Sequence, residues 1–594
     1  MEIIHFFLYN FEVMKDKAKR YSRKAKVKLK DLFKKNENLV EPLDEELSGP
    51  KHEIHGFLLM LGYLGIFLIV AGIIDLIPII IMCFYPVEFS RILAFLIPGV
   101  SSILVGIDLS FLLKGKTKCR LGKYQDLILL IIIWFSACLI AAIPFMLPDY
   151  IGSFRIGGLG LDYVRAIFET ISGFTTTGLS ILEGEISPSH LLITDGKCFL
   201  FFRSVLMFFG GIGFVLVLTC VVSDTFGIRL YYSEGHTDRL LPNLYKSAKM
   251  IFGLYAGLVL VSSIALYLGG MNEWTTIDLP YGCENDPTTS SYFEALCIAM
   301  THLSSGGFST RDLSIYAYNS IPIEIITEII MLFSCTNFII IFSLVTFKFK
   351  KFDDLDLKVQ LTFAAIFIPI LILISGFTTS LSGNNLLTFG ENLRYNIFYY
   401  ISASSTTGSV NSYNAITTFS IPSLAILTLV MAFGGQQGST AGGIKFYRIG
   451  IICKSIYWSI REKNSNSNMI YPHYTAKYGQ LREVNEKDIT DSVTYCLLHF
   501  LIIFVFAILV SLGTNNQFSF VQCCFEVSSA LATTGLSAGI TSYSQNDFVL
   551  TLITIAMFIG RLELYTFIYA GSKCITDIKQ LVSTKIIKHH HANT

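Results

Sequence analysis

The chain has 594 residues, of which 52% are hydrophobic and 15% charged, and its formal net charge is +1. A soluble protein of this size carries about 25% charged residues. Together with a mean hydropathy of +0.57, this composition excludes a soluble globular protein. The nearly neutral balance of charge gives no support to nucleic-acid binding. Several apolar segments exceed the ~20 residues needed to cross a bilayer, which predicts an all-α polytopic membrane protein.

The first segment, residues 1–55, is predicted to be a basic cytoplasmic arm. Between Lys15 and Lys35 it carries eleven Lys or Arg against two Asp. Such a run is typical of a positive-inside anchor that contacts anionic lipid. A dedicated regulatory docking arm is the alternative. We expect no signal peptide, because no small-residue cleavage site follows the apolar start.

Ten apolar segments then follow as predicted membrane spans: 57–84, 92–113, 127–147, 205–223, 251–270, 322–347, 359–376, 421–434, 495–512 and 548–571. Loop charge agrees with this count. The basic loops 114–124, 348–358 and 454–487 fall on the cytoplasmic side, and the acidic loop 271–290 falls outside. The 454–487 loop is polar, and we expect it to be partly disordered.

A short motif recurs between these spans. It reads FTTTGLS, LSSGGFS, SSTTGSV and LATTGLS around Gly178, Gly307, Gly408 and Gly535. Each copy follows a largely apolar stretch of about 10–13 residues, too short to cross the membrane. One Thr-Thr-Gly turn is more often a helix cap or a bend. Four copies in the same context instead predict four helix–pore-loop–helix repeats.

The physics of such a unit favours a pore. Unpaired backbone cannot face lipid, so the turns must be buried in protein or line water. Four turns around one axis would point carbonyl oxygens inward, where they replace the hydration shell of a cation. Glycine permits the required backbone angles, and Thr and Ser add hydroxyl oxygens. The sequence therefore predicts a pseudo-fourfold cation pore.

These motifs, with RSVLMFFGGIGF (203–214), GGQQGSTAGGIKFYR (434–448) and MFIGRLELYT (557–566), resemble the Trk/Ktr/HKT superfamily of potassium transport proteins, specifically its Trk-type membrane subunit. The resemblance implies a multi-pass plasma-membrane protein, as in a bacterial inner membrane, that is not an enzyme. It implies potassium as the transported ion, no bound organic cofactor on this chain, and surrounding membrane lipid. It also implies a homodimer and a cytoplasmic nucleotide-binding regulator of the TrkA type.

The implied organisation is two N-terminal spans followed by the four repeats. Its parts are the arm 1–55, two extra helices 56–115, repeat 1 at 125–224, repeat 2 at 248–348, repeat 3 at 358–460, a cytoplasmic loop 461–488, repeat 4 at 489–578 and a cytoplasmic tail 579–594.

By the same resemblance, the four turns form a selectivity filter that binds potassium. Its residues are Thr176, Thr177, Gly178 and Leu179; Ser305, Gly306, Gly307 and Phe308; Thr406, Thr407, Gly408 and Ser409; and Thr533, Thr534, Gly535 and Leu536. A serine in place of Gly178 accompanies sodium transport in the plant branch, so this glycine favours potassium. Ser409 departs from the family pattern, which has an aromatic or aliphatic residue there.

The stretch 434–445 interrupts the last apolar segment of repeat 3 with five glycines, and glycine costs about 1 kcal/mol per residue in a helix. We expect a gating loop, with close helix packing through small residues as the alternative. The implied gating residues are Gly434, Gly435, Gly438, Ser439, Thr440, Ala441, Gly442, Gly443 and Arg561. A snorkelling or interface role is the alternative for Arg561.

Other charges within apolar segments give weaker signals. Glu169 and Glu526 occupy equivalent places, nine residues before the glycine of their motifs. They supply negative potential near the outer vestibule or bond backbone behind the filter, and both interpretations stay open. Arg203 and Lys445 are expected to fix helix ends or face the cytoplasm.

Two transport mechanisms remain open at this point. The first is a gated, channel-like potassium pore driven by the membrane potential, worth about 2.3 kcal/mol per charge per 100 mV. The second is a potassium symporter coupled to sodium or protons, for which only Glu169 and Glu526 offer buried carboxylates. An intramembrane enzyme finds no support, since the chain has no HExxH motif.

Overall fold

The computed structural model describes residues 56–113, 125–147, 161–182, 196–213, 244–270, 292–311, 314–318, 320–382, 388–412, 419–464 and 473–576. Apart from Gly56 these residues belong to one compact unit, Phe57–Thr594. The predicted basic arm and C-terminal tail lie outside the described residues, as does most of the predicted span 205–223 beyond Gly213.

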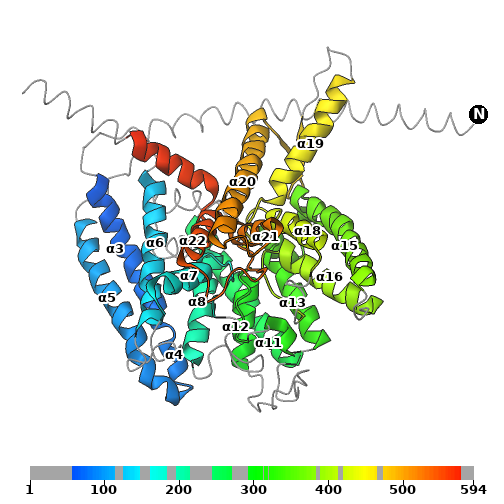
Figure 1. Ribbon diagram of the computed structural model, residues 1–594. Coiled ribbons are helices and arrows are strands. Elements are labelled where there is room, and N and C mark those ends of the chain that lie inside the picture. The colour runs from blue at the N-terminus through cyan, green and yellow to red at the C-terminus, as the bar shows by residue number, and fades with distance from the viewer. Residues whose placement is uncertain are drawn as a thin grey trace, which may run out of the picture. The chain divides into compact units, whose positions relative to one another are not determined.

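The unit begins with α3 (Gly56–Leu76), the short helix α4 (Ile79–Met82), η1 (Pro86–Arg91), α5 (Ile92–Ser110) and η2 (Phe111–Leu113). Helices α3 and α5 lie against each other at one edge of the bundle (Figure 1). A Cβ atom at Gly65 would lie 2.6 Å from the carbonyl oxygen of Gly106, and one at Gly72 would lie 2.5 Å from that of Gly99. Small residues therefore allow this close crossing, as is typical of membrane helices.

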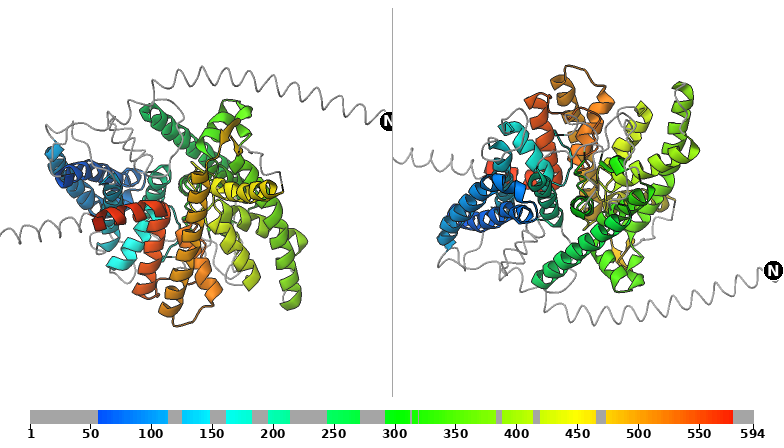
Figure 2. Two further views of the ribbon diagram at one scale, coloured as in Figure 1. Left: turned by 90° about the horizontal axis from the view of Figure 1, so that it is seen from above. Right: turned by 90° about the horizontal axis from the view of Figure 1, so that it is seen from below.

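After η2 the order of long helix, short helix and further helix occurs four times. The first group is α6 (Gln125–Met146), α7 (Tyr163–Phe174) and α8 (Lys197–Ile212), and the second is α11 (Leu244–Leu268), α12 (Tyr292–Leu303), η4 (Ser314–Tyr318), α13 (Ile321–Ser334) and α14 (Phe338–Val345). The third group is η5 (Phe349–Phe352), α15 (Leu355–Ser382), α16 (Phe389–Ser404), α18 (Ile421–Ala432) and α19 (Phe446–Lys463). The fourth group is α20 (Glu486–Gly513), α21 (Phe520–Leu531) and α22 (Asp547–Arg561), followed by a helix at Leu564–Thr576. Figure 2 shows these four groups following one another in chain order around a common centre.

The described residues contain fewer unbroken apolar helices than the ten spans predicted, and one of those spans, 205–223, is described only to Gly213. Within the described ranges, six helices are long and apolar enough to span a membrane, or up to eight if each of two bent pairs counts as one span. One bent pair is α13 with α14, which meet at 115°, and the other is α22 with Leu564–Thr576, at 99°. In addition, α18 has only 12 residues. The predicted spans at 322–347 and 548–571 therefore each contain a sharp bend, which hydropathy does not register.

The 454–487 segment contains more structure than expected. Helix α19 runs to Lys463, and β1 (Tyr474–Lys477) pairs antiparallel with β2 (Gln480–Glu483), Lys477 opposite Gln480. Tyr478 and Gly479 have φ of 52° and 76°, the combination that a tight two-residue hairpin turn requires. The hairpin 474–483 is thus regular structure within a segment expected to be partly disordered, and residues 465–472 lie outside the described part.

Candidate functional site

The four short helices α7, α12, α16 and α21 end in the same way, each four residues before the glycine of its motif. We name the segments that follow turn 1 (176–179), turn 2 (305–308), turn 3 (406–409) and turn 4 (533–536). The first residue of each turn has left-handed backbone: φ is 55° at Thr176, 59° at Ser305, 53° at Thr406 and 53° at Thr533. The glycine two positions later is also left-handed in every turn, with φ from 66° to 96°.

Hydrogen bonding repeats as well. The backbone N–H of the residue before each glycine donates to the carbonyl five residues earlier: Thr177 to Ser172 at 2.9 Å, Gly306 to Thr301 at 2.9 Å, Thr407 to Ser402 at 3.0 Å and Thr534 to Ser529 at 2.7 Å. This is the Schellman pattern of a helix C-terminus, in which glycine normally takes the left-handed position. Three turns have threonine there, a β-branched residue for which that conformation is strained. Such strain persists where the surrounding structure enforces it, as at binding sites.

The four turns close a ring. A Cβ atom at Gly178 of turn 1 would overlap the carbonyl oxygen of Gly306 in turn 2. In the same sense, one at Gly307 would overlap the Thr407 carbonyl, one at Gly408 the Thr534 carbonyl, and one at Gly535 the Thr177 carbonyl. Each turn therefore contacts the next through glycine and a main-chain oxygen, and turn 4 returns to turn 1. All sixteen residues predicted for the filter lie in this ring.

The loop 434–445 lies against the ring. The Thr440 hydroxyl lies 2.7 Å from the Ser305 hydroxyl, and the Gly442 N–H donates to Thr406 Oγ1 at 2.9 Å. A Cβ atom at Gly442 would overlap Thr533 Oγ1. The loop thus contacts the first residue of three turns. In the described part of the chain, Thr176 Oγ1 and Thr533 Oγ1 are buried without a hydrogen-bond partner.

The same loop is bound to the break between α13 and α14. Thr440 Oγ1 lies 2.9 Å from the carbonyl oxygen of Ser334, and the Gln436 N–H donates to the Cys335 carbonyl at 3.0 Å. The Gln436 side chain accepts from the Asn337 N–H at 3.1 Å and donates to Gln360 Oε1 at 2.6 Å. Gln436 is fully buried, so these bonds fix a loop whose glycines alone would leave it mobile.

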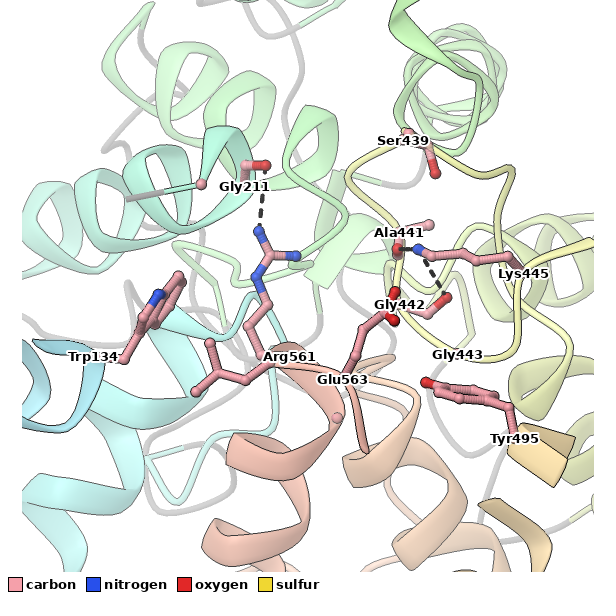
Figure 3. Close-up of a pocket in the computed structure, with 14 residues that line it drawn as sticks. Trp134, Gly211, Ser439, Ala441, Gly442, Gly443, Lys445, Tyr495, Arg561 and Glu563 are labelled. Carbon is pink, nitrogen blue, oxygen red and sulfur yellow. Dashed lines mark hydrogen bonds between the residues drawn. The ribbon is translucent and has the colours of Figure 1, made fainter. Parts of the chain in front are cut away.

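A polar cavity lies beside this loop, and Figure 3 shows side chains that line it. Arg561, the last residue of α22, donates to the Thr440 carbonyl at 3.2 Å and to the carbonyls of Gly210 and Gly211 at the end of α8. Lys445 donates to the Ala441 carbonyl, so it holds the end of the loop at the start of α19. Two cationic groups therefore converge on the loop next to the ring. Gly434, Gly435, Gly438, Ser439 and Gly443 complete the loop residues predicted for gating.

Glu563 lies in the short break between α22 and the helix Leu564–Thr576, and it pairs with Arg448 of α19. The Arg448 Nη2 to Glu563 Oε2 distance is 2.9 Å, and the Arg448 guanidinium also lies 3.9 Å from the centre of the Tyr495 ring. This pair joins the last helix of the chain to the helix that leaves the loop.

The hairpin 474–483 also contacts the loop 434–445. Lys477 donates to Gln437 Oε1 at 3.3 Å, and Asn337 Nδ2 donates to the Tyr478 hydroxyl at 2.8 Å as well as to the Gln437 carbonyl. The hairpin is anchored in turn to residues before α15, because the Gly479 N–H donates to the Asp353 carbonyl at 2.8 Å. A segment expected to be a loop therefore lies in contact with 434–445.

Arg203 is not at a helix end or in the cytoplasm, so that expectation was wrong. It is 1% exposed and donates to Glu169 Oε1 at 2.8 Å and to the Ser180 hydroxyl at 3.0 Å. It also donates to the Ser309 carbonyl at 3.3 Å, which joins the segments after turns 1 and 2. A buried guanidinium needs a carboxylate partner, and the pattern of charges in sequence did not identify this one.

The two equivalent glutamates bond backbone behind the turns. Glu169 accepts from the Ser180 hydroxyl at 3.0 Å and the Ile181 N–H at 3.3 Å. Glu526 accepts from the Ser537 hydroxyl at 2.8 Å and the Ala538 N–H at 2.8 Å. In both cases the partners lie eleven and twelve residues further along the chain. These contacts favour a role in bonding backbone behind the filter over a role in supplying negative potential near the outer vestibule.

The ends of α8, α13, α18 and α22 share a sequence pattern that was not recognised above as the end of a helix. The segments read MFFGGIGF (207–214), MLFSCTNF (331–338), MAFGGQQG (431–438) and MFIGRLEL (557–564). A Cβ atom at Gly210 would overlap the Phe174 carbonyl, and one at Gly560 would overlap the Leu531 carbonyl. In the first and fourth groups, small residues therefore let the end of α8 approach the end of α7 and the end of α22 approach the end of α21.

Comparison with known proteins agrees with this architecture. A family profile described as TrkH, cation transport protein, matches residues 137–577. The chain is 29% identical over 528 residues to an uncharacterized cation transporter of Methanocaldococcus jannaschii, covering 86% of this chain and 94% of that one. It is 26% identical over 508 residues to the Trk system potassium uptake protein TrkG of Escherichia coli, covering 82% and 92%.

The fold is similar to that of the potassium transporter TrkH from Vibrio parahaemolyticus in its crystal structure. The TM-score is 0.68 at 20% identity, covering 86% of this chain and 98% of that one. These findings confirm the predicted all-α polytopic membrane fold and the resemblance to the Trk-type subunit. Since the family profile spans most of the sequence, the chain belongs to the TrkH family of cation transport proteins.

Proposed function

We propose that this protein takes up potassium through a gated, channel-like pore that passes through the ring of four turns. The observation that carries the proposal is the closed cycle in which each turn's glycine contacts the next turn's carbonyl. The printed names of relatives support potassium as the ion, since the Escherichia coli relative is a potassium uptake protein and the Vibrio protein a potassium transporter.

The chemistry of the ring suits a dehydrated monovalent cation. Main-chain carbonyls of the four turns act as a selectivity filter by replacing the water ligands of the ion. The short helices all point their C-terminal ends at the ring, where the helix dipole is negative. Among the described residues, the buried hydroxyls of Thr176 and Thr533 have no hydrogen-bond partner and add two further oxygens to the ring, and that of Thr533 lies next to Gly442 of the loop.

The loop 434–445 acts as the gate in this proposal, and the arrangement seen here is its closed state. Support comes from its contacts with Ser305, Thr406 and Thr533, one residue from each of three turns. Arg561 adds a positive charge beside the same path, which opposes cation passage until the loop moves.

Coupled symport is the second candidate, and one observation favours it. Asp75 in α3 is 1% exposed, and its Oδ2 has no hydrogen-bond partner within the described residues. A buried carboxyl of this kind is a candidate proton or sodium site. Glu169 and Glu526 support symport less, because both are engaged by several donors behind the turns.

Assembly follows from the family resemblance. We propose a homodimer in the lipid bilayer with one pore per chain. A cytoplasmic nucleotide-binding regulator of the TrkA type would act on the gate, and the relatives' designation as parts of a Trk system supports a partner. The contact between hairpin 474–483 and the loop offers that partner a route to the gate from the cytoplasmic side.

Rubidium flux into liposomes that hold the purified protein separates the two mechanisms. The channel mechanism predicts uptake that follows an imposed potassium diffusion potential with no sodium or proton gradient present. Uptake that appears only when such a gradient is added, and that Asp75→Asn abolishes, would establish symport instead.

A further inference from the structure

Turn 3 differs from the other three at the residue after its glycine. That residue is Leu179 in turn 1, Phe308 in turn 2 and Leu536 in turn 4, but Ser409 in turn 3. A compensating difference lies in the short helices, five residues before each glycine. There α7 has Gly173, α16 has Ala403 and α21 has Ala530, whereas α12 has His302. At this one place in the ring, the short helix thus carries the large side chain and the turn carries the small one.

His302 and Ser409 belong to neighbouring groups of helices, and their side chains contact each other. At the interface of the first and second groups, a Cβ atom at Gly173 would lie 3.5 Å from Cε2 of the Phe308 ring. At the next interface, His302 Nε2 lies 2.5 Å from the Ser409 hydroxyl. A glycine thus faces a phenylalanine at one interface, and a histidine faces a serine at the next.

We assign the direction of this hydrogen bond from the contacts of the other ring nitrogen. His302 Nδ1 lies 3.0 Å from the Ile298 carbonyl, which can only accept, and 3.2 Å from the Thr301 hydroxyl, so we place the proton on Nδ1. In the neutral ring Nε2 is then the acceptor and the Ser409 hydroxyl is the donor. The Ser409 carbonyl accepts from the Ser402 hydroxyl at 2.8 Å. Ser409 is therefore held by its side chain and by its main chain, and both His302 and Ser409 are fully buried.

We propose that His302 is a positioning residue that sets the ion selectivity of turn 3 through its hydrogen bond to Ser409. This inference rests on the proposed function of the ring as a selectivity filter. The other three turns have a bulky apolar side chain at this position, which locates the turn by packing. Turn 3 depends on a directional bond instead. Without the Nε2 acceptor, the buried Ser409 hydroxyl loses this partner, and turn 3 loses the directional bond that positions it.

Four variants test this: His302→Ala, which removes the acceptor; Ser409→Ala, which removes the donor; His302→Gln, which keeps an acceptor near the Nε2 position; and His302→Ala with Ser409→Leu, which recreates the Ala403 and Leu536 combination of the next interface. The measurement is the sodium-to-potassium permeability ratio from bi-ionic reversal potentials of the full chain in planar bilayers. Cys297→Ala, a buried truncation on the same helix, is the control.

We expect His302→Ala and Ser409→Ala to raise the ratio by about 2- to 10-fold, the equivalent of one lost hydrogen bond. His302→Gln and the double variant should return it to within about twofold of the parent protein, and Cys297→Ala should leave it unchanged. Monodisperse elution verifies that each variant is folded. If His302→Ala does not fold, Ser409→Ala alone tests the loss of the hydrogen bond. A parent-like ratio in both single variants, or no rescue by the double variant, overturns the inference. If Gly178→Ser alters the ratio while these variants do not, the filter stands without this role for His302; if none alters it, the proposed function falls too.

Discussion

The hydroxyl of Thr440, in the middle of loop 434–445, lies 2.7 Å from the hydroxyl of Ser305, the first residue of turn 2. The same oxygen also lies 2.9 Å from the Ser334 carbonyl and 3.2 Å from the Leu303 carbonyl. One side chain therefore joins the loop to both the ring and the broken helix α13. A substitution at Thr440 therefore weakens the contact between loop and ring while leaving the residues of all four turns unchanged.

Thr440→Val should raise basal rubidium flux. Valine matches threonine in shape but lacks the hydroxyl oxygen that bonds the loop to the ring. If this contact couples loop and ring by about 1–3 kcal/mol, its loss shifts the closed-to-open ratio by about 5- to 150-fold. The measurement is uptake by liposomes without any regulator. Thr428→Val on α18 is the matched control, because the Thr428 hydroxyl bonds only within its own helix, to the Leu424 carbonyl. Equal flux in both variants would contradict the gate.

Gly442→Ala should have a similar effect for a steric reason. An added Cβ would overlap Thr533 Oγ1 and the Ala532 carbonyl, so the loop could no longer lie against turn 4. We expect basal flux to rise by about 5-fold or more, within the range of such coupling energies. Gly390→Ala serves as the control, since nothing lies within 4 Å of a Cβ at that position. Flux at or below the level of the control would count against this account.

Tyr478→Phe should raise basal flux more modestly. It removes the hydroxyl that accepts from Asn337 Nδ2 at 2.8 Å, a bond worth about 0.5–1.5 kcal/mol, so we expect an increase of about 2- to 10-fold. Tyr474→Phe changes an exposed residue of the same hairpin and should leave flux unaltered. If both substitutions change basal flux equally, the Tyr478 hydroxyl does not specifically restrain the loop.

Glu169→Gln should destabilise the protein, because it leaves the Arg203 guanidinium buried without its countercharge. Breaking a buried ion pair by removing one partner costs about 3–5 kcal/mol. The measurement is thermal unfolding in detergent, read as loss of monodisperse protein. Glu483→Gln, at an exposed position of β2, is the control and should unfold like the parent. An unchanged midpoint for Glu169→Gln would show that the pair contributes nothing to stability.

The turns could be located from sequence because their signal is local and repeated. Threonine or serine before glycine, after a short apolar stretch, marks the end of a helix whatever the rest of the chain does. The loop 434–445 was recognised for a similar reason, since five glycines make a continuous helix unfavourable. Both predictions depend on backbone conformation within a few residues.

What the sequence could not supply are contacts between distant segments. The break at Cys335–Asn337 is maintained by bonds from Gln436, about a hundred residues away, and local hydropathy gave no sign of it. The pairing of Arg203 with Glu169 and of His302 with Ser409 likewise depends on which helices become neighbours. The hairpin 474–483 was missed because its exposed strand β2 lacks an apolar alternation.

The central claim is that the ring of four turns selects the ion, and a bi-ionic reversal potential tests it most directly. With potassium on one side of a planar bilayer and sodium on the other, the parent protein should show a potential near the potassium limit. Gly178→Ser should shift it toward sodium, because the added side chain would overlap the Gly306 carbonyl of turn 2. Gly257→Ser, where nothing lies within 4 Å, should not. A parent protein without preference for potassium, or a Gly178→Ser potential identical to that of Gly257→Ser, would contradict the account.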